Sequence, residues 1–260
     1  MSLNNKNYYT YINNKTTPIV FIHGVGLDRN MWGPQINFFR KYSTITYDLL
    51  GHGNTPFNKD KITMEDFTNQ LMSLIEDLKI TKLHLVGFSI GSLIALDFAS
   101  SFHNKLSSLT LIATTYKRNE KQRQEVIDRV NLAKSNKPIS KLALKRWFTD
   151  EYLEKNPKIY EEFMRILTKE PEEQKNFIKA YELFAHHKDD IEKIKKINTK
   201  TLVMTGSIDP GSTPEMSKNL SSDLKNSQYI EINKGKHLCS IECSDDVNIN
   251  IEKFITNESD

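Results

Sequence analysis

The sequence predicts an α/β fold with a mostly parallel central sheet that is covered by helices on both faces. Short apolar runs recur along the chain, and the stretches between them carry apolar residues at a helical period. Parallel strands need crossover connections, which are usually helices, so this alternation favours a sheet buried between two helical layers. At 260 residues the chain is long enough for one such core and an insertion.

The strands are expected near residues 8–12, 18–22, 43–48, 82–87, 107–113, 201–205 and 228–232. An apolar stripe from Phe67 to Leu78 predicts a helix after the third strand, with Thr63 as its N-cap. Thr213 followed by Pro214 indicates another helix start, because proline fits the first helical position. A final helix is expected from about residue 245 to 255.

One segment interrupts the alternation of strands and helices. Residues 117–196 carry only helical patterns. We therefore expect a core domain made of residues 1–116 and 197–260, with residues 117–196 inserted between the sixth and seventh strands as a helical cap. Such a cap excludes water from a site and shapes its pocket.

A serine stands on a glycine-flanked turn between a strand and a helix. Residues 87–91 read Gly-Phe-Ser-Ile-Gly, directly after the strand at 82–87. A sharp turn of this kind projects the hydroxyl of Ser89 clear of the backbone, and the following helix aims its unpaired N–H groups at the same point. Larger residues at the flanks would collide with the strand and the helix. The pattern predicts a nucleophilic serine beneath the cap.

A serine hydroxyl needs a base and an orienting acid before it can act as a nucleophile. Asp209 follows the strand at 201–205 and His237 follows the strand at 228–232, where open parallel sheets place their sites. Singly, Asp209 is better interpreted as a turn residue and His237 as a surface histidine. Together, and in the order that strand–turn–helix nucleophiles use, they predict a Ser89–His237–Asp209 triad.

The oxyanion of acyl transfer needs hydrogen-bond donors. Residues 23–26, His-Gly-Val-Gly, follow an early apolar run, and we expect the backbone N–H groups of Val25 and Ile90 to form the oxyanion hole. His23 is expected to bond the loop backbone rather than to act as a second base. Asp48 and His52 are expected to hold a neighbouring loop in place.

The chain resembles the α/β-hydrolase superfamily over nearly its whole length. The resemblance rests on residues 23–26, on residues 47–53, on the serine turn, and on Asp209 and His237. Within the superfamily the chain is similar to the capped hydrolases grouped with 3-oxoadipate enol-lactonases. That similarity rests on residues 27–32, 146–149 and 211–214.

The chain also departs from those proteins. Ser92 stands where many relatives carry a second glycine, and Cys239 and Cys243 are not expected in the lactonases. The resemblance implies an α/β-hydrolase fold with a helical cap and a mechanism that needs no metal and no organic cofactor.

Three residues are candidates for substrate binding. Arg146 could clamp a carboxylate while the indole of Trp147 walls the pocket; alternatively, Arg146 pairs with surface acids and Trp147 belongs to the core of the cap. Trp32 follows the oxyanion loop, and packing is favoured for it over contact with substrate.

Composition excludes several classes of protein. The 36 basic and 33 acidic residues leave a net charge of only +3, and no basic block is interleaved with aromatic residues, so nucleic acid is not an expected partner. The two cysteines suit free thiols in a reducing compartment better than a disulfide framework or a zinc site. No signal-like or membrane-spanning segment is evident, so a cytoplasmic protein without membrane contact is expected.

We therefore expect a serine hydrolase that cleaves a small carboxylic ester or lactone, in the manner of an enol-lactonase, through an acyl-enzyme intermediate. The alternatives are an amide or vinylogous-imide hydrolase of ring degradation, an esterase for methyl esters of carrier-bound acyl chains, a perhydrolase and a non-catalytic ligand receptor.

Overall fold

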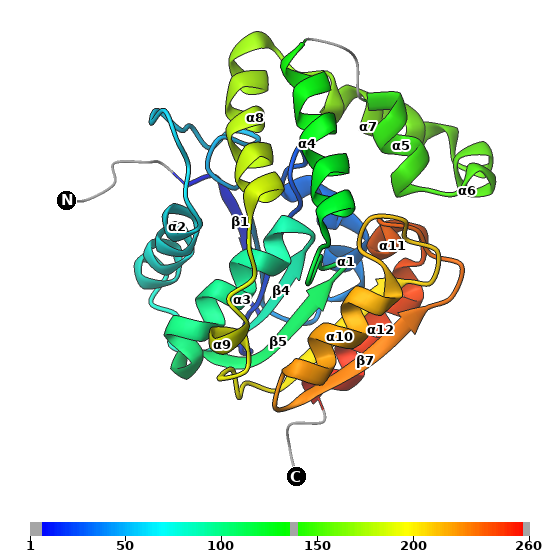
Figure 1. Cartoon of the computed structure of the whole chain (residues 1–260). Coiled ribbons are helices and arrows are strands. Elements are labelled where there is room, and N and C mark those ends of the chain that lie inside the picture. The colour runs from blue at the N-terminus through cyan, green and yellow to red at the C-terminus, as the bar shows by residue number, and fades with distance from the viewer. Residues whose placement is uncertain (1–6, 136–139, 257–260) are drawn as a thin grey trace.

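The computed structural model describes residues 7–135 and 140–256. Its centre is a seven-stranded sheet with the order β1-β3-β2-β4-β5-β6-β7, drawn in Figure 1. The strands are β1 (Tyr9–Ile12), β2 (Ile19–Ile22), β3 (Thr44–Tyr47), β4 (Leu83–Phe88), β5 (Leu106–Ile112), β6 (Thr201–Gly206) and β7 (Ser227–Ile232). Only β1 runs antiparallel to its neighbour within this sheet. The predicted mostly parallel sheet is confirmed, with every expected strand present.

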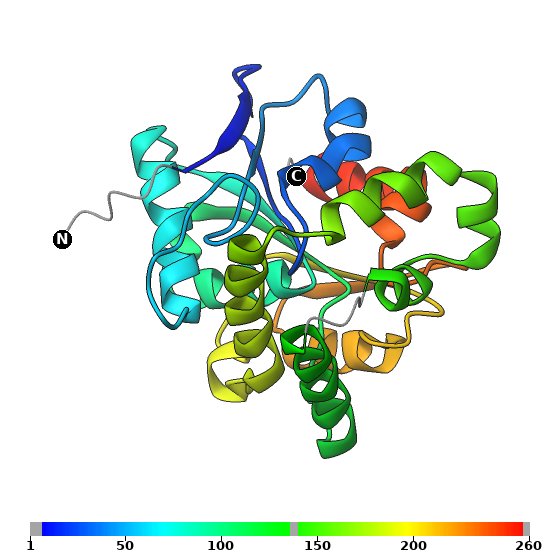
Figure 2. The same cartoon turned by 90° about the horizontal axis from the view of Figure 1, so that it is seen from above.

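Two hydrophobic layers lie on opposite faces of the sheet, because successive side chains of a strand point in opposite directions. In β2, Val20 and Ile22 join the layer formed with α2 (Met64–Asp77) and α3 (Ile90–Phe102). Ile19 and Phe21 join the other layer, formed with α1 (Gly33–Phe38) and α12 (Ser244–Thr256). Figure 2 shows α1 and α12 together on one side of the sheet and α2 and α3 on the other.

The helix boundaries follow the capping residues that the sequence indicates. Thr63 caps α2 in a reciprocal arrangement with Asp66, and Thr213 caps α10 (Pro214–Asp223). Each threonine hydroxyl accepts a backbone N–H that the first helical turn leaves unpaired. None of the helices in the described parts of the chain is both long enough and apolar enough to cross a membrane.

A group of helices connects β5 to β6. They are α4 (Glu120–Lys134), α5 (Ser140–Trp147), α6 (Asp150–Lys155), α7 (Pro157–Leu167), α8 (Pro171–His186) and α9 (Ile191–Ile194). In Figure 1, α4 and α8 stand side by side above the carboxyl ends of the strands, whereas α9 packs against α3. The insertion lies where it was expected along the chain, between the strands expected at 107–113 and 201–205. These strands are β5 and β6, the fifth and sixth in chain order, and not the sixth and seventh.

Candidate active site

The turn between β4 and α3 holds Ser89 in a conformation that few non-glycine residues adopt. Its φ is 55°, and its N–H donates to the carbonyl of Ile112 at 2.9 Å. A Cβ added to Gly87 would lie 2.3 Å from the Gly91 carbonyl oxygen, and one added to Gly91 would lie 2.3 Å from that of Ile22. Only glycine fits at either flank, so the surrounding backbone fixes the turn and maintains the strain at Ser89.

The acid and the histidine meet beyond the ends of β6 and β7. Nδ1 of His237 donates to Oδ2 of Asp209 at 2.7 Å. The other carboxylate oxygen accepts the backbone N–H groups of Gly211 at 2.8 Å and Ser212 at 3.0 Å. The Asp209 side chain is fully buried, so these bonds fix its orientation, and its bond to Nδ1 leaves Nε2 as the histidine nitrogen that can accept a proton.

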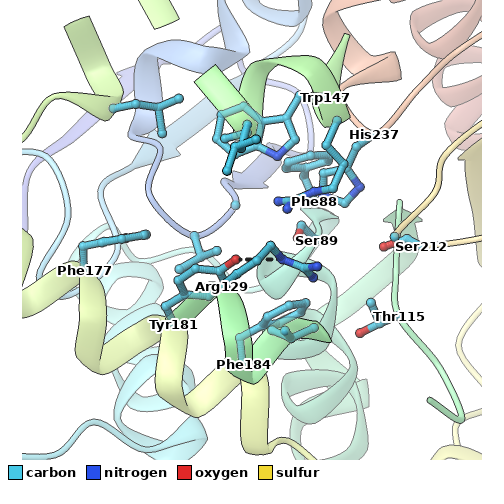
Figure 3. A pocket seen from close by; sticks show the side chains of 18 of the residues that line it. Phe88, Ser89, Thr115, Arg129, Trp147, Phe177, Tyr181, Phe184, Ser212 and His237 are labelled. Atoms are coloured by element: carbon cyan, nitrogen blue, oxygen red, sulfur yellow. Dashed lines mark hydrogen bonds between the residues drawn. The ribbon is translucent and has the colours of Figure 1, made fainter. Parts of the chain in front are cut away.

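The same pocket is lined by Ser89 and His237, as Figure 3 shows. Within the described residues no hydrogen bond joins the two side chains. Such bonds are often long in free enzymes and tighten when substrate binds. The structure thus brings all three predicted triad residues to one place, with the Asp209–His237 bond already formed.

Two backbone segments lie beside Ser89. Ile90 is the first residue of α3, so its N–H has no partner within the helix. Val25 and Gly24 line the pocket from the loop after β2, and a Cβ on Gly24 would lie 3.5 Å from Cβ of Ser89. Both expected donors, Val25 and Ile90, therefore lie on segments next to the hydroxyl.

His23 supports this loop. Its Nε2 accepts the N–H of Leu49 at 2.9 Å, and its Nδ1 donates to the carbonyl of Gly24 at 2.8 Å. Complete burial lowers the pKa of the imidazole, so the neutral ring that these two bonds require is favoured. The expected structural role of His23 agrees with these contacts.

The expected loop-holding role of Asp48 is also visible in its contacts. Its carboxylate accepts the backbone N–H groups of Arg29 and Asn54, each at 2.9 Å, and pairs with the Arg29 guanidinium. Nδ1 of the buried His52 bonds the Leu50 carbonyl at 3.1 Å. The contacts with Arg29 tie the loop after β3 to the segment after the loop of residues 23–26. The bonds to Asn54 and Leu50 hold the loop after β3 in its own shape.

The opposite wall of the pocket comes from the inserted helices. Residues that line it are Arg129 from α4, Arg146 and Trp147 from α5, and Phe177, Tyr181 and Phe184 from α8. Nε of Arg129 donates to the hydroxyl of Tyr181 at 3.2 Å, drawn as a dashed line in Figure 3. Sequence reasoning did not single out Arg129, because nothing in the pattern of α4 separates it from the other basic residues there.

Two of the three predicted substrate contacts line this pocket. Arg146 lies on its wall, and burial lowers the pKa of its guanidinium. Trp147 also lines the pocket, and its ring packs edge-on against Phe163. It therefore contributes to both the pocket wall and the core of the inserted helices. Trp32 takes the packing role, and its place among the candidate substrate contacts is corrected: its side chain is fully buried against Phe21, with ring centroids 5.0 Å apart, and is not part of the lining.

Metal-binding side chains do not gather at any place in the described parts of the chain. Among residues 7–135 and 140–256, no three or more His, Cys, Asp and Glu side chains are grouped as a metal site requires. Cys239 is buried, Cys243 is half-buried, and both are free thiols.

Known proteins resemble this chain in sequence and in structure. A family model described as the alpha/beta hydrolase fold matches residues 17–242. An (E)-2-((N-methylformamido)methylene)succinate hydrolase from Acinetobacter baylyi is 29% identical over 94% of this chain and 92% of its own length. A 3-oxoadipate enol-lactonase from the same organism is 25% identical over 91% of this chain and 87% of its own.

The solved structures agree with the sequence comparison. An enol-lactonase from Burkholderia xenovorans superposes with a TM-score of 0.90 at 22% identity, covering 98% of both chains. A thermophilic esterase from Thermogutta terrifontis gives a TM-score of 0.88 at 22% identity, covering 98% of this chain and 95% of its own. The sheet order, the serine turn and the family match lead to one conclusion: the chain belongs to the α/β-hydrolase family.

Proposed function

We propose that this hydrolase cleaves a small carboxylic ester or lactone through an acyl-enzyme intermediate, with Ser89 as nucleophile, His237 as base and Asp209 as orienting acid. The observation that carries the proposal is the 2.7 Å bond between Asp209 and His237 beside a pocket that the strained Ser89 turn also lines. A nucleophile, a base and an orienting group in that order are the minimum for activating a serine.

The steps follow from the roles of these groups. Nε2 of His237 takes the Ser89 proton as the hydroxyl oxygen attacks the substrate carbonyl, while Asp209 stabilises the imidazolium. The N–H groups of Val25 and Ile90 stabilise the oxyanion, and losing one such donor costs about 100- to 1000-fold in rate. His237 then protonates the leaving group, and a water molecule activated by His237 hydrolyses the acyl-serine.

The proposed substrate carries a carboxylate. Arg146 lies in the wall of an otherwise largely apolar pocket, where a guanidinium can bind a carboxylate through two parallel hydrogen bonds. The two Acinetobacter relatives are named for substrates derived from carboxylic acids, which supports the same substrate class here.

Cleavage of a C–N bond is the second candidate function. It is favoured by the relative whose named substrate contains an N-methylformamido group and which matches 94% of this chain. The same triad and oxyanion donors can serve both reactions, because each passes through a tetrahedral oxyanion.

A labelling experiment tests the nucleophile. A fluorophosphonate probe is expected to modify Ser89 in the wild type, as located by peptide mass spectrometry, and Ser89→Ala is expected to abolish both labelling and p-nitrophenyl acetate hydrolysis. Ser101→Ala, an exposed serine on the same helix, is the matched control. Circular dichroism checks that both variants fold. Retained turnover by folded Ser89→Ala would contradict the proposal.

A substrate panel decides between the two bond types. Matched esters, lactones and N-acyl enamines, each with and without a distal carboxylate, are assayed with the wild type. We expect the highest kcat/KM for a carboxylate-bearing ester or lactone. A higher value for the carboxylate-bearing N-acyl enamine would transfer the proposal to C–N cleavage while leaving the nucleophile unchanged.

A further inference from the structure

We propose that the substrate carries two carboxylate groups and that Arg129, acting with Arg146, binds one of them. The inference rests on the proposed function for the reaction itself and adds the charge of the substrate and a second specificity-determining residue. It begins from the pocket wall formed by α4, α5 and α8, which we call the helical wall, made of Arg129, Arg146, Trp147, Phe177, Tyr181 and Phe184.

The charge of the pocket is unbalanced. Its lining contains Arg129 and Arg146 but no aspartate or glutamate, and neither arginine forms a salt bridge with a carboxylate among the described residues. Both side chains are half-buried, and a cation that has lost part of its contact with water gains from an anion held close to it. Two guanidinium groups over one small pocket therefore indicate a ligand with two negative charges, because a single carboxylate leaves one cation unbalanced.

The geometry directs Arg129 into the site. Nε of Arg129 donates to the Tyr181 hydroxyl at 3.2 Å, and Figure 3 shows the rest of the guanidinium extending past that hydroxyl to the space below Ser89. Arg146 also interacts with the Tyr181 hydroxyl. Tyr181 thus holds the two guanidinium groups near each other, and the remaining N–H groups of Arg129 are available to a ligand.

Other polar groups of the lining are donors without partners. Nε1 of Trp147 and Oγ of Ser212 are buried and make no hydrogen bond among the described residues, and both residues line the pocket. An indole N–H can only donate, and a free hydroxyl can donate its proton. A ligand made of acceptors, as carboxylates are, satisfies these donors and the two guanidinium groups together.

A structural role for Arg129 is the competing explanation. Its bond to Tyr181 joins α4 to α8, two helices that pack closely, and on that reading its charge has no ligand. Binding of simple acids separates the two explanations, because a structural arginine does not discriminate between a dicarboxylate and the matching monocarboxylate.

The experiment measures binding by titration calorimetry to the Ser89→Ala variant, which leaves the helical wall intact. Succinate is compared with butyrate, and glutarate with valerate, so that each pair differs in one carboxylate. We expect the dicarboxylate of the better-fitting pair to bind about 10- to 100-fold more tightly, as expected for one added charge-assisted contact. Adding Arg129→Gln is expected to remove this advantage, and adding the exposed Arg40→Gln is expected to preserve it.

The outcomes are distinct. Equal affinities within both pairs, or a dicarboxylate advantage that survives in folded Arg129→Gln, would overturn the inference. If Arg129→Gln does not fold, Arg129→Met takes its place, because it keeps an apolar stem of similar length and removes the charge. A dicarboxylate advantage that is unchanged in folded Arg129→Met would overturn the inference equally. Because binding needs no catalysis, selective binding without turnover would refute the proposed function alone.

Discussion

The two walls of the pocket are built in different ways. On the sheet side, backbone geometry and internal hydrogen bonds determine each position: Ser89 has a φ of 55°, and Asp209 uses both carboxylate oxygens within the protein. On the helical wall, Trp147 carries a buried donor that has no partner among the described residues, and the side-chain partner of Arg129 in the same part of the chain is a neutral hydroxyl. The sheet side is complete without a ligand, and the helical wall is not.

This difference separates two tasks of a hydrolase. Groups that stabilise a transition state work best when the fold holds them in place before substrate arrives. Groups that select a substrate are instead left to be satisfied by it, so that a wrong ligand leaves them unpaired. We infer that changes on the sheet side reduce catalysis or folding, whereas changes on the helical wall alter which substrate is used.

The largest expected effect comes from the sheet side. Asp209→Asn keeps the shape of the side chain but loses the charge that holds the His237 tautomer, and kcat is expected to fall about 10⁴-fold. Steady-state kinetics with p-nitrophenyl acetate measure the loss. A fall of less than tenfold would show that Asp209 only supports the loop through Gly211 and Ser212.

Ser92 offers a test of how the serine turn is held together. Its hydroxyl accepts the N–H of Ile112 at 3.1 Å and lies 2.7 Å from the Gly87 carbonyl oxygen. Ser92→Ala removes the hydroxyl that links the Gly87 and Ile112 backbones across the turn, which is expected to lower the free energy of unfolding by about 1–2 kcal/mol. Urea denaturation measures the change, with Ser101→Ala as control on the exposed face of α3. Equal stability of the two variants would contradict this reading.

The interior of the sheet carries a pH dependence of similar size. Burial, aided by the nearby charge of Lys200, lowers the pKa of His84 to about 4. The unfolded chain then binds a proton more readily than the folded protein, so stability is full above about pH 6.5 and falls as the pH drops towards 4. At pH 5 the loss is about 2 kcal/mol from this residue.

The variant His84→Gln is expected to reduce the loss of stability between pH 7 and pH 5, measured by urea denaturation at each pH. The exposed His103→Gln at the end of α3 is the matched control. An unchanged slope in His84→Gln would show that other groups carry the acid sensitivity.

The sequence predicted the sheet side in detail for a physical reason. Gly91, Ser89 and His237 each act next to a strand end, and strand ends can be located from apolar runs and turn residues. Arg129 and Tyr181 lie 52 residues apart on separate helices, and their meeting depends on how α4 packs against α8. No local pattern encodes that packing. The position of Trp32 after a loop likewise does not separate an indole that packs in the core from one that lines a pocket.

The smallest effect gives the sharpest contrast between the walls and the core. Ser212 and Ser217 are both fully buried serines whose hydroxyls lack partners among the described residues, but only Ser212 lines the pocket. Replacing either with alanine removes an unpaired group, so both variants are expected to match the wild-type stability within about 0.5 kcal/mol.

Their kinetics are expected to differ. Ser212→Ala removes a hydroxyl that a bound carboxylate can use, and the KM for a carboxylate-bearing ester is expected to rise about 3- to 10-fold, while Ser217→Ala keeps the wild-type KM. The backbone N–H of Ser212 still bonds Asp209 in both proteins, so kcat is expected to change little. A lower kcat with an unchanged KM would place this hydroxyl with the catalytic side of the pocket, and the division between the two walls would then have to be redrawn at Ser212.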